Sequence, residues 1–275
     1  MRHVAGLSTG PPLNAALRVT LNFHPDRVDR GIHILDAMVT SGTYLSQFAT
    51  GSSNGGLTAH PGGDRWRWES RIFGGAYDGV PEHLRPVYGA LNFRHKPVGA
   101  APRFGSAHLR LTADVLPRTT FCYPDSHFEP ANFAVAANMS LIELAEADQR
   151  DALDDYIEAQ VHGSVRLDRD IEALVLDPSY RGTAVETTAK RLPCPVEWHA
   201  GSRLAVDELR RHPEYRGQQY VDLGVEIAVD GWLTPRVIGD AMAFGRYGEQ
   251  DLKRVWHCLA RFGTSGLGSL RATGD

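Results

Sequence analysis

The sequence has few cysteines and lacks the common signatures of metal and nucleotide sites. Cys122, Cys194 and Cys258 lie far apart and form no C-x-x-C pair, so neither a zinc knot nor a disulfide framework is expected. No two histidines have H-x-H or H-x-x-x-H spacing, and we expect no metal. The G-x-G-x-x-G and Walker sequences are also missing, which excludes the usual phosphate-binding loops.

Long apolar runs and runs of one charge are missing as well. No apolar run is long enough to cross a bilayer, and Met1–Val4 do not lead into the apolar core of a signal peptide. The formal net charge is -4 and no stripe of basic residues is present, so neither nucleic acid nor a membrane surface is the expected partner. We expect a protein made in a reducing cytoplasm, although export without a cleavable signal would leave no trace here.

The chain does have the composition of a globular protein with a proper core. Its 275 residues are 42% hydrophobic and 23% charged. Short alternating segments with helical segments between them predict an α+β fold. The expected strands are 17–23, 43–48, 86–92, 106–111, 119–123, 156–167, 171–176 and 195–199, and the expected helices are 28–39, 133–153, 183–191 and most of 203–262.

One predicted strand, Tyr156–Leu167, contains a row of polar side chains. Residues two apart in a strand share a face, so Glu158, Gln160 and His162 are expected to point the same way. A short charged turn and the strand 171–176 follow, which predicts a hairpin. Such a polar row suits a cleft, and the alternative is a half-exposed strand with a solvated face.

The end of the first predicted strand is a second candidate site. Pro25 stops the strand, and His24 and Arg27 are expected at its end. An arginine there can hold a phosphate, and a histidine can hydrogen-bond a ribose. The segment 48–56, with Phe48, small residues and glycines, suits close approach to a ligand. The alternatives are a solvated strand end and a plain surface loop.

The segment Arg65–Arg71 contains three arginines and two tryptophans in seven residues. Interpreted as a strand, it places Arg65, Arg67, Glu69 and Arg71 on one face and Trp66 and Trp68 on the other. The charged face could bind a pyrophosphate, with Arg67 as the candidate, or a protein partner. The alternative is an internal, salt-bridged strand with a buried pair of tryptophans.

Taken in order, these pieces resemble the ADP-ribosyltransferase superfamily. Its first strand carries a histidine or arginine, where this chain has His24 and, past Pro25, Arg27. Its second strand carries small hydroxyl residues, and a later strand carries the catalytic glutamate, for which Glu158 is the match. Tyr88–Leu91 is similar to its tyrosine motif.

Longer strings resemble a bacterial family of CteC-like effectors that ADP-ribosylate a threonine of host ubiquitin, over residues 17–262. They are Leu21–Arg27, Ser46–Phe48 leading into 53–56, Gly63–Asp78 and Tyr156–Gly163. The chain differs from the superfamily in having Glu-x-Gln where most members place the glutamate second, and in lacking a Ser-Thr-Ser motif. Gln160 carries no full charge, so Glu158 is taken as the catalytic acid.

The resemblance implies one ADP-ribosyltransferase-like domain over residues 1–275. Its catalytic core, 17–200, would be a split β-sandwich of two small sheets with inserted helices, and 201–262 a helical extension. NAD would be the substrate, with no metal, and Phe48 would stack on nicotinamide. The other expected NAD-binding residues are His24, Arg27, Thr50, Gly51, Ser53, Asn54 and Arg67.

Under this resemblance, Glu158 would stabilise the ribosyl cation while a protein hydroxyl attacks. The protein would act in the bacterial cytoplasm or, as a secreted effector or toxin, inside host cells. Two alternatives stay open. One is an NAD glycohydrolase with water as the acceptor, and the other is a non-catalytic binding or immunity module that uses the arginine–tryptophan segment as an interface.

Overall fold

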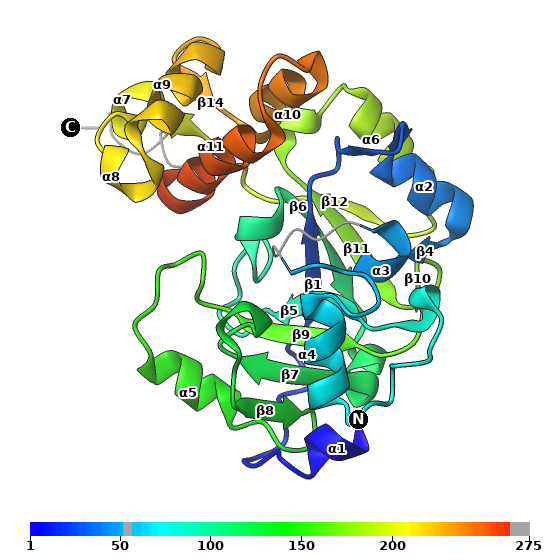
Figure 1. The fold of residues 1–275 in the computed structure, drawn as a ribbon. Coiled ribbons are helices and arrows are strands. Elements are labelled where there is room, and N and C mark those ends of the chain that lie inside the picture. The colour runs from blue at the N-terminus through cyan, green and yellow to red at the C-terminus, as the bar shows by residue number, and fades with distance from the viewer. Residues whose placement is uncertain (52–56, 265–275) are drawn as a thin grey trace, which may run out of the picture.

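The structure, a computed structural model, describes residues 1–51 and 57–264 (Figure 1). Within these residues the main element is an eight-stranded sheet in the order β12-β11-β6-β1-β5-β9-β7-β8. Its strands are β1 (Val19–Phe23), β5 (Val87–Leu91), β6 (Ala107–Leu111), β7 (Thr119–Tyr123), β8 (Asn132–Val135), β9 (Ile157–Val161), β11 (Ile171–Leu176) and β12 (Val196–Trp198).

In the described ranges, three two-stranded pairs and the helices surround this sheet. The pairs are β2 (Val28–Asp29) with β3 (Ile32–His33), β4 (Thr43–Tyr44) with β10 (Val165–Arg166), and β13 (Leu204–Ala205) with β14 (Trp232–Leu233). The α-helices are α1 (Arg2–Ala5), α2 (Ile34–Ser41), α3 (Gln47–Thr50), α4 (Asp64–Ile72), α5 (Leu141–Ala147), α6 (Ala184–Ala189), α7 (Val206–Leu209), α8 (Pro213–Arg216), α9 (Gln218–Ile227), α10 (Pro235–Phe244) and α11 (Glu249–Phe262). The 3-10 turns are η1 (Glu82–Leu84), η2 (Pro102–Phe104), η3 (Ala113–Arg118), η4 (Ser126–Phe128) and η5 (Pro178–Tyr180).

The sheet is continuous, but it is weakly joined in the middle. Strands β1 and β5 pair through only two residue pairs, Val19 with Leu91 and Thr20 with Ala90. Beyond them, β1 continues beside β6 as far as Phe23, and β5 continues beside β9. The predicted separation into two small sheets is therefore not confirmed. The strands form one hydrogen-bonded sheet whose two halves diverge after these pairs.

The strands β9 and β11 were expected to form a hairpin, and this prediction is wrong. Strand β9 pairs with β5 and β7, whereas β11 pairs with β6 and β12 in the other half of the sheet. The connection leaves the sheet because β10 pairs with β4 instead. Asp170 fixes its end by accepting hydrogen bonds from the Arg118 guanidinium and the Arg166 amide, both at 2.8 Å.

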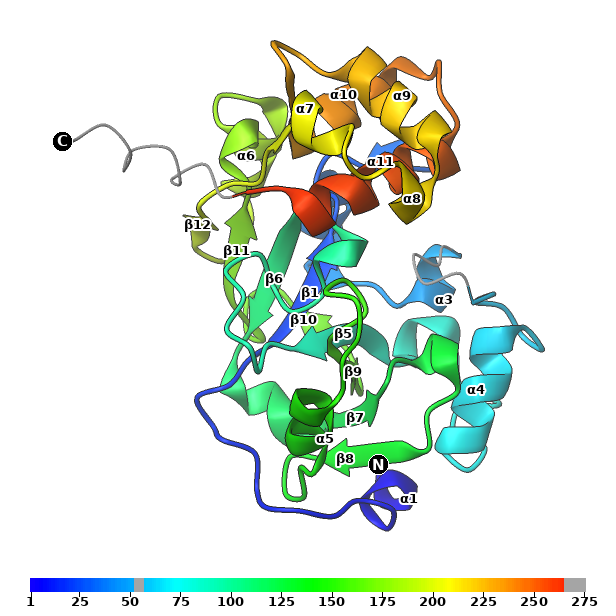
Figure 2. The ribbon, with the colours of Figure 1, turned by 90° about the vertical axis from the view of Figure 1, so that its left-hand side faces the viewer.

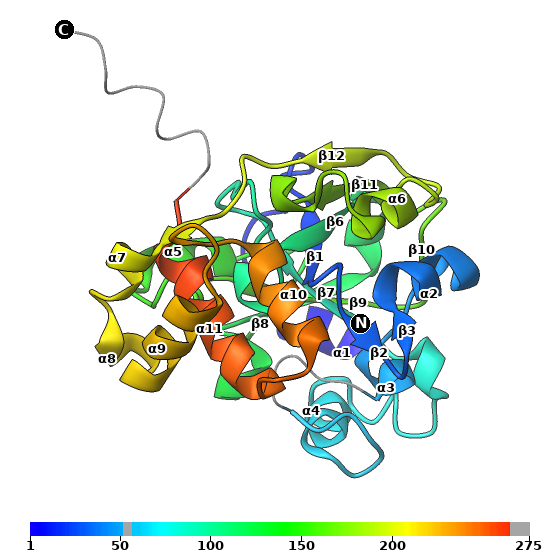
Figure 3. The ribbon, with the colours of Figure 1, turned by 90° about the horizontal axis from the view of Figure 1, so that it is seen from above.

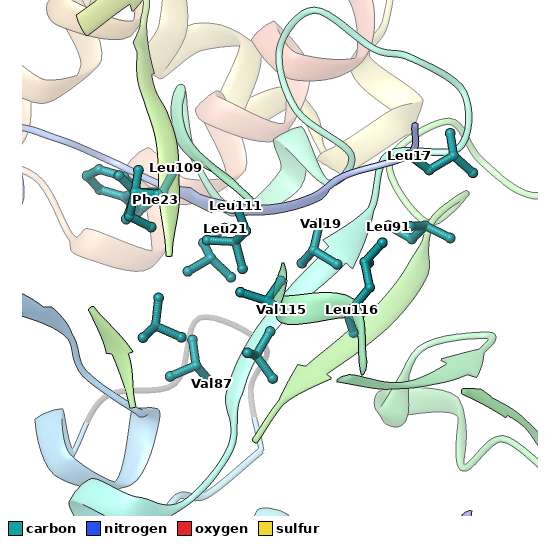
Figure 4. Close-up of a cluster of buried hydrophobic side chains, with 14 of the residues drawn as sticks. Leu17, Val19, Leu21, Phe23, Val87, Leu91, Leu109, Leu111, Val115 and Leu116 are labelled. Carbon is teal, nitrogen blue, oxygen red and sulfur yellow. The ribbon is translucent and has the colours of Figure 1, made fainter. Parts of the chain in front are cut away.

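The main core lies against one face of β1, β5 and β6 (Figure 4). Val19, Leu21 and Phe23 alternate along β1 and all enter this core. Thr20 and Asn22, between them, point to the opposite face, yet all five residues of β1 are buried. Strand β1 therefore separates the core from a polar region on its other side.

The arginine–tryptophan segment is the helix α4, so its prediction as a strand is wrong. The helical period turns Arg65, Trp68, Glu69 and Ile72 inward, at spacings of three and four residues. Arg67 is exposed on the other side. The pattern of charged and aromatic residues in this seven-residue segment fits both the two-residue period of a strand and the 3.6-residue period of a helix. Tertiary packing decides in favour of the helix.

Three further segments differ from their predictions because of local turns. The expected helix 28–39 begins as the β2–β3 hairpin, since Arg30 and Gly31 both have positive φ, and becomes helical only at α2. The expected strand 43–48 keeps two strand residues before α3, whose N-cap Ser46 accepts from the Ala49 amide. The expected helix 133–153 is strand β8 followed by α5.

The C-terminal segment is helical, as predicted, and has an apolar cluster of its own. Helices α7 to α11 lie at the end of the sheet where β1 ends (Figures 2 and 3). Helix α11 joins the two parts, because the Trp256 indole N–H donates to the carbonyls of Pro102 and Arg103 in η2, both at 3.1 Å. In the part of the chain that is described, no helix is long and apolar enough to span a membrane.

The helical assignment of α4 can be tested by comparing its two tryptophans. Trp68 is 5% exposed, and Trp66 is only half-buried. We expect Trp68→Ala to lower the free energy of unfolding by ~3–5 kcal/mol. Trp66→Ala should cost about 1 kcal/mol. Urea denaturation measures both, and equal large losses would indicate that the two rings share a buried face, as in a strand.

Candidate active site

A cavity of about 330 Å³ opens where β1 and β5 diverge. This volume lies in the range of small-molecule sites, about 300–1,000 Å³. One wall is apolar and comes from α2, with Ile34, Ala37 and Met38. Another wall is polar and comes from α4, β5, η4 and β9. Of the residues that the sequence predicted for the site, His24, Arg27, Thr50 and Glu158 line this cavity.

Glu158 lies in the polar wall and is 6% exposed. Its Oε2 accepts hydrogen bonds from the Ser126 hydroxyl at 2.7 Å and the Ser126 amide at 3.2 Å. Its Oε1 accepts from the Gln160 side-chain amide at 3.0 Å. Strand alternation explains the placement, because Glu158 and Gln160 share the polar face of β9 while Ile157 and Ala159 enter the core. The predicted polar face of this strand is confirmed.

Two opposing effects act on the pKa of Glu158: burial raises it, and nearby hydrogen-bond donors and a positive charge lower it. Burial raises the pKa of Glu158 above its ordinary value, and the nearby Asp125 carboxylate adds to this. The Arg65 guanidinium, 3.9 Å from Oε1, and the hydrogen bonds from Ser126 act in the opposite direction. A carboxylate held by donors in a low-dielectric wall can act strongly on a positive charge that develops in the cavity.

Arg65 is a site residue that the strand interpretation did not single out. It is 3% exposed, and its Nη1 donates to the Ser126 hydroxyl at 2.5 Å. Its guanidinium carbon lies 4.1 Å from the centre of the Tyr88 ring. The Tyr88 hydroxyl in turn donates to Glu69 Oε1 at 2.8 Å. The signal for Arg65 was the spacing of residues 65, 68, 69 and 72, which fits a helix face.

Two more lining residues, Asp125 and Ser126, were also missed by the sequence analysis. They belong to the turn after β7, where the Asp125 side chain caps η4 by accepting from the His127 amide. Asp125 also accepts from the Tyr156 hydroxyl. The sequence of this turn contains no motif that predicts a site. The turn lies beside Glu158 only because β7 pairs with β9.

His24 follows directly on β1, as the sequence predicted, and its side chain lines the cavity. Its ring lies edge-to-face against Trp256 of α11, with the ring centres 4.8 Å apart. Burial lowers the pKa of His24 to about 3, and the positive charges of Arg27 and Lys253 add to this. His24 is therefore neutral near pH 7 and can hydrogen-bond an uncharged hydroxyl of a ligand.

The cations at the cavity rim are Arg27 and Arg30. Arg27 also forms an ion pair with Glu249 of α11 at 2.5 Å. Arg30 donates to the Thr50 carbonyl at 2.8 Å. It packs against Gly51, which ends α3 with a φ of 65°. The predicted residues Ser53 and Asn54 lie outside the described part of the chain.

Of the predicted binding residues that the structure describes, Phe48, Gly51 and Arg67 do not line the cavity. Phe48 is 2% exposed, and the Arg85 guanidinium covers its ring at 4.2 Å, so it is part of the interior instead of a stacking platform. Arg67 is exposed on the far side of α4 and pairs with Asp64 at 2.6 Å. Phe48 and Arg67 lie in helices, α3 and α4, in segments that were expected to be strands.

The described residues contain no group of three or more His, Cys, Asp or Glu side chains that could hold a metal ion. The cavity is lined by two buried acids, Glu158 and Asp125, by the neutral imidazole of His24 and by arginines. Its donors and charges suit an organic ligand that carries both hydroxyl and phosphate groups.

Comparison with known proteins identifies the family of the chain. The family model described as "Protein of unknown function (DUF3626)" matches residues 18–139 and 131–262, and the chain belongs to this family. No curated protein matches it. One solved structure that it resembles is Thermus sp. 2.9 DarT in complex with NAD+, with 14% identity over 68% of this chain and 97% of that chain. The TM-score of 0.39 is too low for an argument about function.

The rim of the cavity can be tested by titrating NAD calorimetrically. We expect Arg27→Ala to weaken NAD binding at least ~10-fold, through the loss of a charge-assisted contact. His24→Ala should weaken it ~3- to 10-fold, through the loss of a neutral hydrogen bond. Arg67→Ala, which removes a cation outside the cavity, should leave the affinity unchanged. Unchanged affinity in the first two variants would remove this rim from the NAD site.

Proposed function

We propose that this protein is a mono-ADP-ribosyltransferase that transfers ADP-ribose from NAD to a hydroxyl group of a protein. The observation that carries the proposal is the buried Glu158 in one wall of a cavity whose rim holds a neutral histidine and two arginines. Few reactions need a fixed negative charge beside a sugar and cations beside phosphates at the same time. Cleavage of the bond between nicotinamide and ribose in NAD is such a reaction.

The residues present fit NAD as a substrate. Arg27 and Arg30 at the rim supply positive charge for the pyrophosphate, and neutral His24 supplies a partner for a ribose hydroxyl. The apolar wall of α2, with Ile34 and Met38, offers a surface for an aromatic ring. Because Phe48 is buried under Arg85, we propose that the nicotinamide ring packs on the α2 wall instead.

The chemistry required of the chain is mainly electrostatic. In the reaction the bond between the ribose anomeric carbon and the nicotinamide nitrogen breaks, and the pyridinium leaves as neutral nicotinamide. Positive charge develops on the ribosyl group, and the Glu158 carboxylate stabilises it. A hydroxyl oxygen of the acceptor then bonds to the anomeric carbon, and the hydroxyl proton passes to solvent. Arg65 and Ser126 hold Glu158 in place during these steps.

For the acceptor we propose a threonine of ubiquitin, which would make the protein a bacterial effector that acts inside host cells. This part rests on the resemblance of Leu21–Arg27, Gly63–Asp78 and Tyr156–Gly163 to the CteC-like effectors. We further propose that residues 1–275 act as one catalytic unit. The contacts of Trp256 with His24 and η2 support this, because they tie the C-terminal helices to the rim of the cavity.

The proposed activity is tested by intact-mass analysis of ubiquitin after incubation with the protein and NAD. We expect one ADP-ribosyl unit to be added, and peptide mapping should locate it on a threonine. Release of free ADP-ribose at the same rate with and without ubiquitin would instead indicate an NAD glycohydrolase. An absence of NAD turnover with ubiquitin and with a cell lysate would favour a non-catalytic module.

The role of Glu158 is tested with a neutral variant and a matched control. Glu158→Gln should lower NAD turnover ~10²–10³-fold while NAD affinity changes little, because the charge acts mainly in the transition state. Glu172→Gln is the control, since Glu172, on β11, is exposed, lies outside the cavity and pairs with Arg18 and Arg110. Near-normal turnover in Glu158→Gln would show that another acid is responsible.

A further inference from the structure

The polar face of β9 continues beyond Gln160 into a chain of hydrogen bonds whose members lie outside the cavity lining. We propose that Gln160, Thr120, His162 and Tyr77 form a positioning relay that fixes the orientation of Glu158 through a single allowed arrangement of protons. This inference rests on the proposed function, in which Glu158 is the catalytic acid. It assigns roles to four residues, none of which lines the cavity.

The relay is continuous at hydrogen-bond distances. Gln160 Nε2 donates to Glu158 Oε1 at 3.0 Å, and the Thr120 hydroxyl donates to Gln160 Oε1 at 2.9 Å. Thr120 Oγ1 lies 2.9 Å from His162 Nε2. His162 Nδ1 lies 2.7 Å from the Tyr77 hydroxyl. The relay therefore runs from Gln160 on β9 to Thr120 on β7. It then returns to His162, just beyond β9, and ends at Tyr77 in the turn after α4.

Proton counting leaves one arrangement of this chain. Thr120 has one hydroxyl proton, and it goes to the Gln160 carbonyl, so Thr120 must accept from His162. His162 therefore carries its proton on Nε2. Its Nδ1 is then an acceptor, and the Tyr77 hydroxyl must donate to it. In this arrangement every member of the relay donates its hydrogen bond to the next member in the direction of Glu158.

The contacts of Gln160 with Glu158 and Cys122 fix the orientation of its side-chain amide. Its Nε2 donates both to Glu158 Oε1 and to Cys122 Sγ, the latter at 3.4 Å. A flipped amide would place its carbonyl oxygen against the carboxylate and its NH₂ group against the Thr120 proton. Because Gln160 and Thr120 are both fully buried, water cannot repair that mismatch.

The titration behaviour of the two outer members agrees with this arrangement. Burial lowers the pKa of His162 to about 3, so the ring is neutral near pH 7 and keeps a free acceptor nitrogen. Burial raises the pKa of Tyr77 to about 12, so the phenol keeps the proton that it donates. The relay can therefore hold one set of protons across the physiological range.

Packing holds the His162 ring in the orientation that the relay needs. The ring stacks on Tyr77, with planes 22° apart, and meets Phe73 edge-on at 5.0 Å. The His162 amide donates to the Arg118 carbonyl at 2.9 Å, which anchors the backbone just beyond β9. Figures 1 and 2 show α4 beside the half of the sheet that contains β9 and β7, so the turn after α4 comes within reach of this histidine.

The first measurement reads the proton arrangement directly and needs no activity. Long-range ¹⁵N–¹H NMR of the wild-type protein at pH 7 should show His162 as the neutral tautomer with its proton on Nε2. His162→Phe identifies the signal by its disappearance. A proton on Nδ1, or a doubly protonated ring, overturns the relay. This outcome is separate from the proposed function, which fails if the wild-type protein transfers no ADP-ribose from NAD to a protein.

The second measurement asks whether the relay acts on Glu158. Tyr77→Phe removes one hydroxyl outside the cavity, and we expect kcat to fall about 3- to 10-fold while KM for NAD stays constant. Tyr123→Phe is the matched control, because its hydroxyl donates to Asp148 on a different side of the sheet, and kcat should not change. An unchanged kcat in Tyr77→Phe, or an equal loss in the control, overturns the positioning role.

Discussion

The divergence of β1 from β5 is the constraint on which the rest of the site depends. After two residue pairs the strands separate, and the space between them becomes the cavity. Gly89 makes the close crossing possible, since a Cβ there would lie 2.6 Å from the Thr20 carbonyl oxygen and 2.5 Å from the Leu21 side chain. The two halves of the sheet then supply different parts of the site. The β1 half brings His24 and the rim, and the β9 half brings the buried acid.

A buried carboxylate needs hydrogen-bond donors and a compensating positive charge. Here the residues that supply them are themselves held by further contacts. Glu158 receives hydrogen bonds from Ser126 and Gln160, and Arg65 provides the compensating charge. Arg65 is itself held in place by the Tyr88 ring, and the ion pair of Glu69 with Arg85, at 2.6 Å, lies behind it. Removing one member would leave a charge or a donor unpaired in the interior. This explains why helix α4, which contains few apolar residues, buries Arg65 and Glu69 on its inner face.

The C-terminal helices complete the rim of the cavity. Helix α11 places Trp256 against His24 and against η2, and it places Glu249 beside Arg27. Both rim residues that follow β1 therefore depend on a segment more than 200 positions later in the chain. The same contacts shield His24 from water, which keeps its imidazole neutral. The C-terminal helices thus affect the protonation of His24, although the proposed catalytic acid, Glu158, lies elsewhere in the chain.

The sequence by itself determined the features that depend on local backbone geometry. Alternation placed Glu158, Gln160 and His162 on one face, Pro25 ended β1 at His24, and helical periodicity identified the C-terminal helices. Tertiary structure alone decided that β9 and β11 lie in different halves of the sheet, and that Asp125 and Ser126 meet Glu158. It also decided that Arg65, and not Arg67, enters the cavity wall. A short charged segment fits two periods equally well, and only the burial of one face against distant strands selects between them.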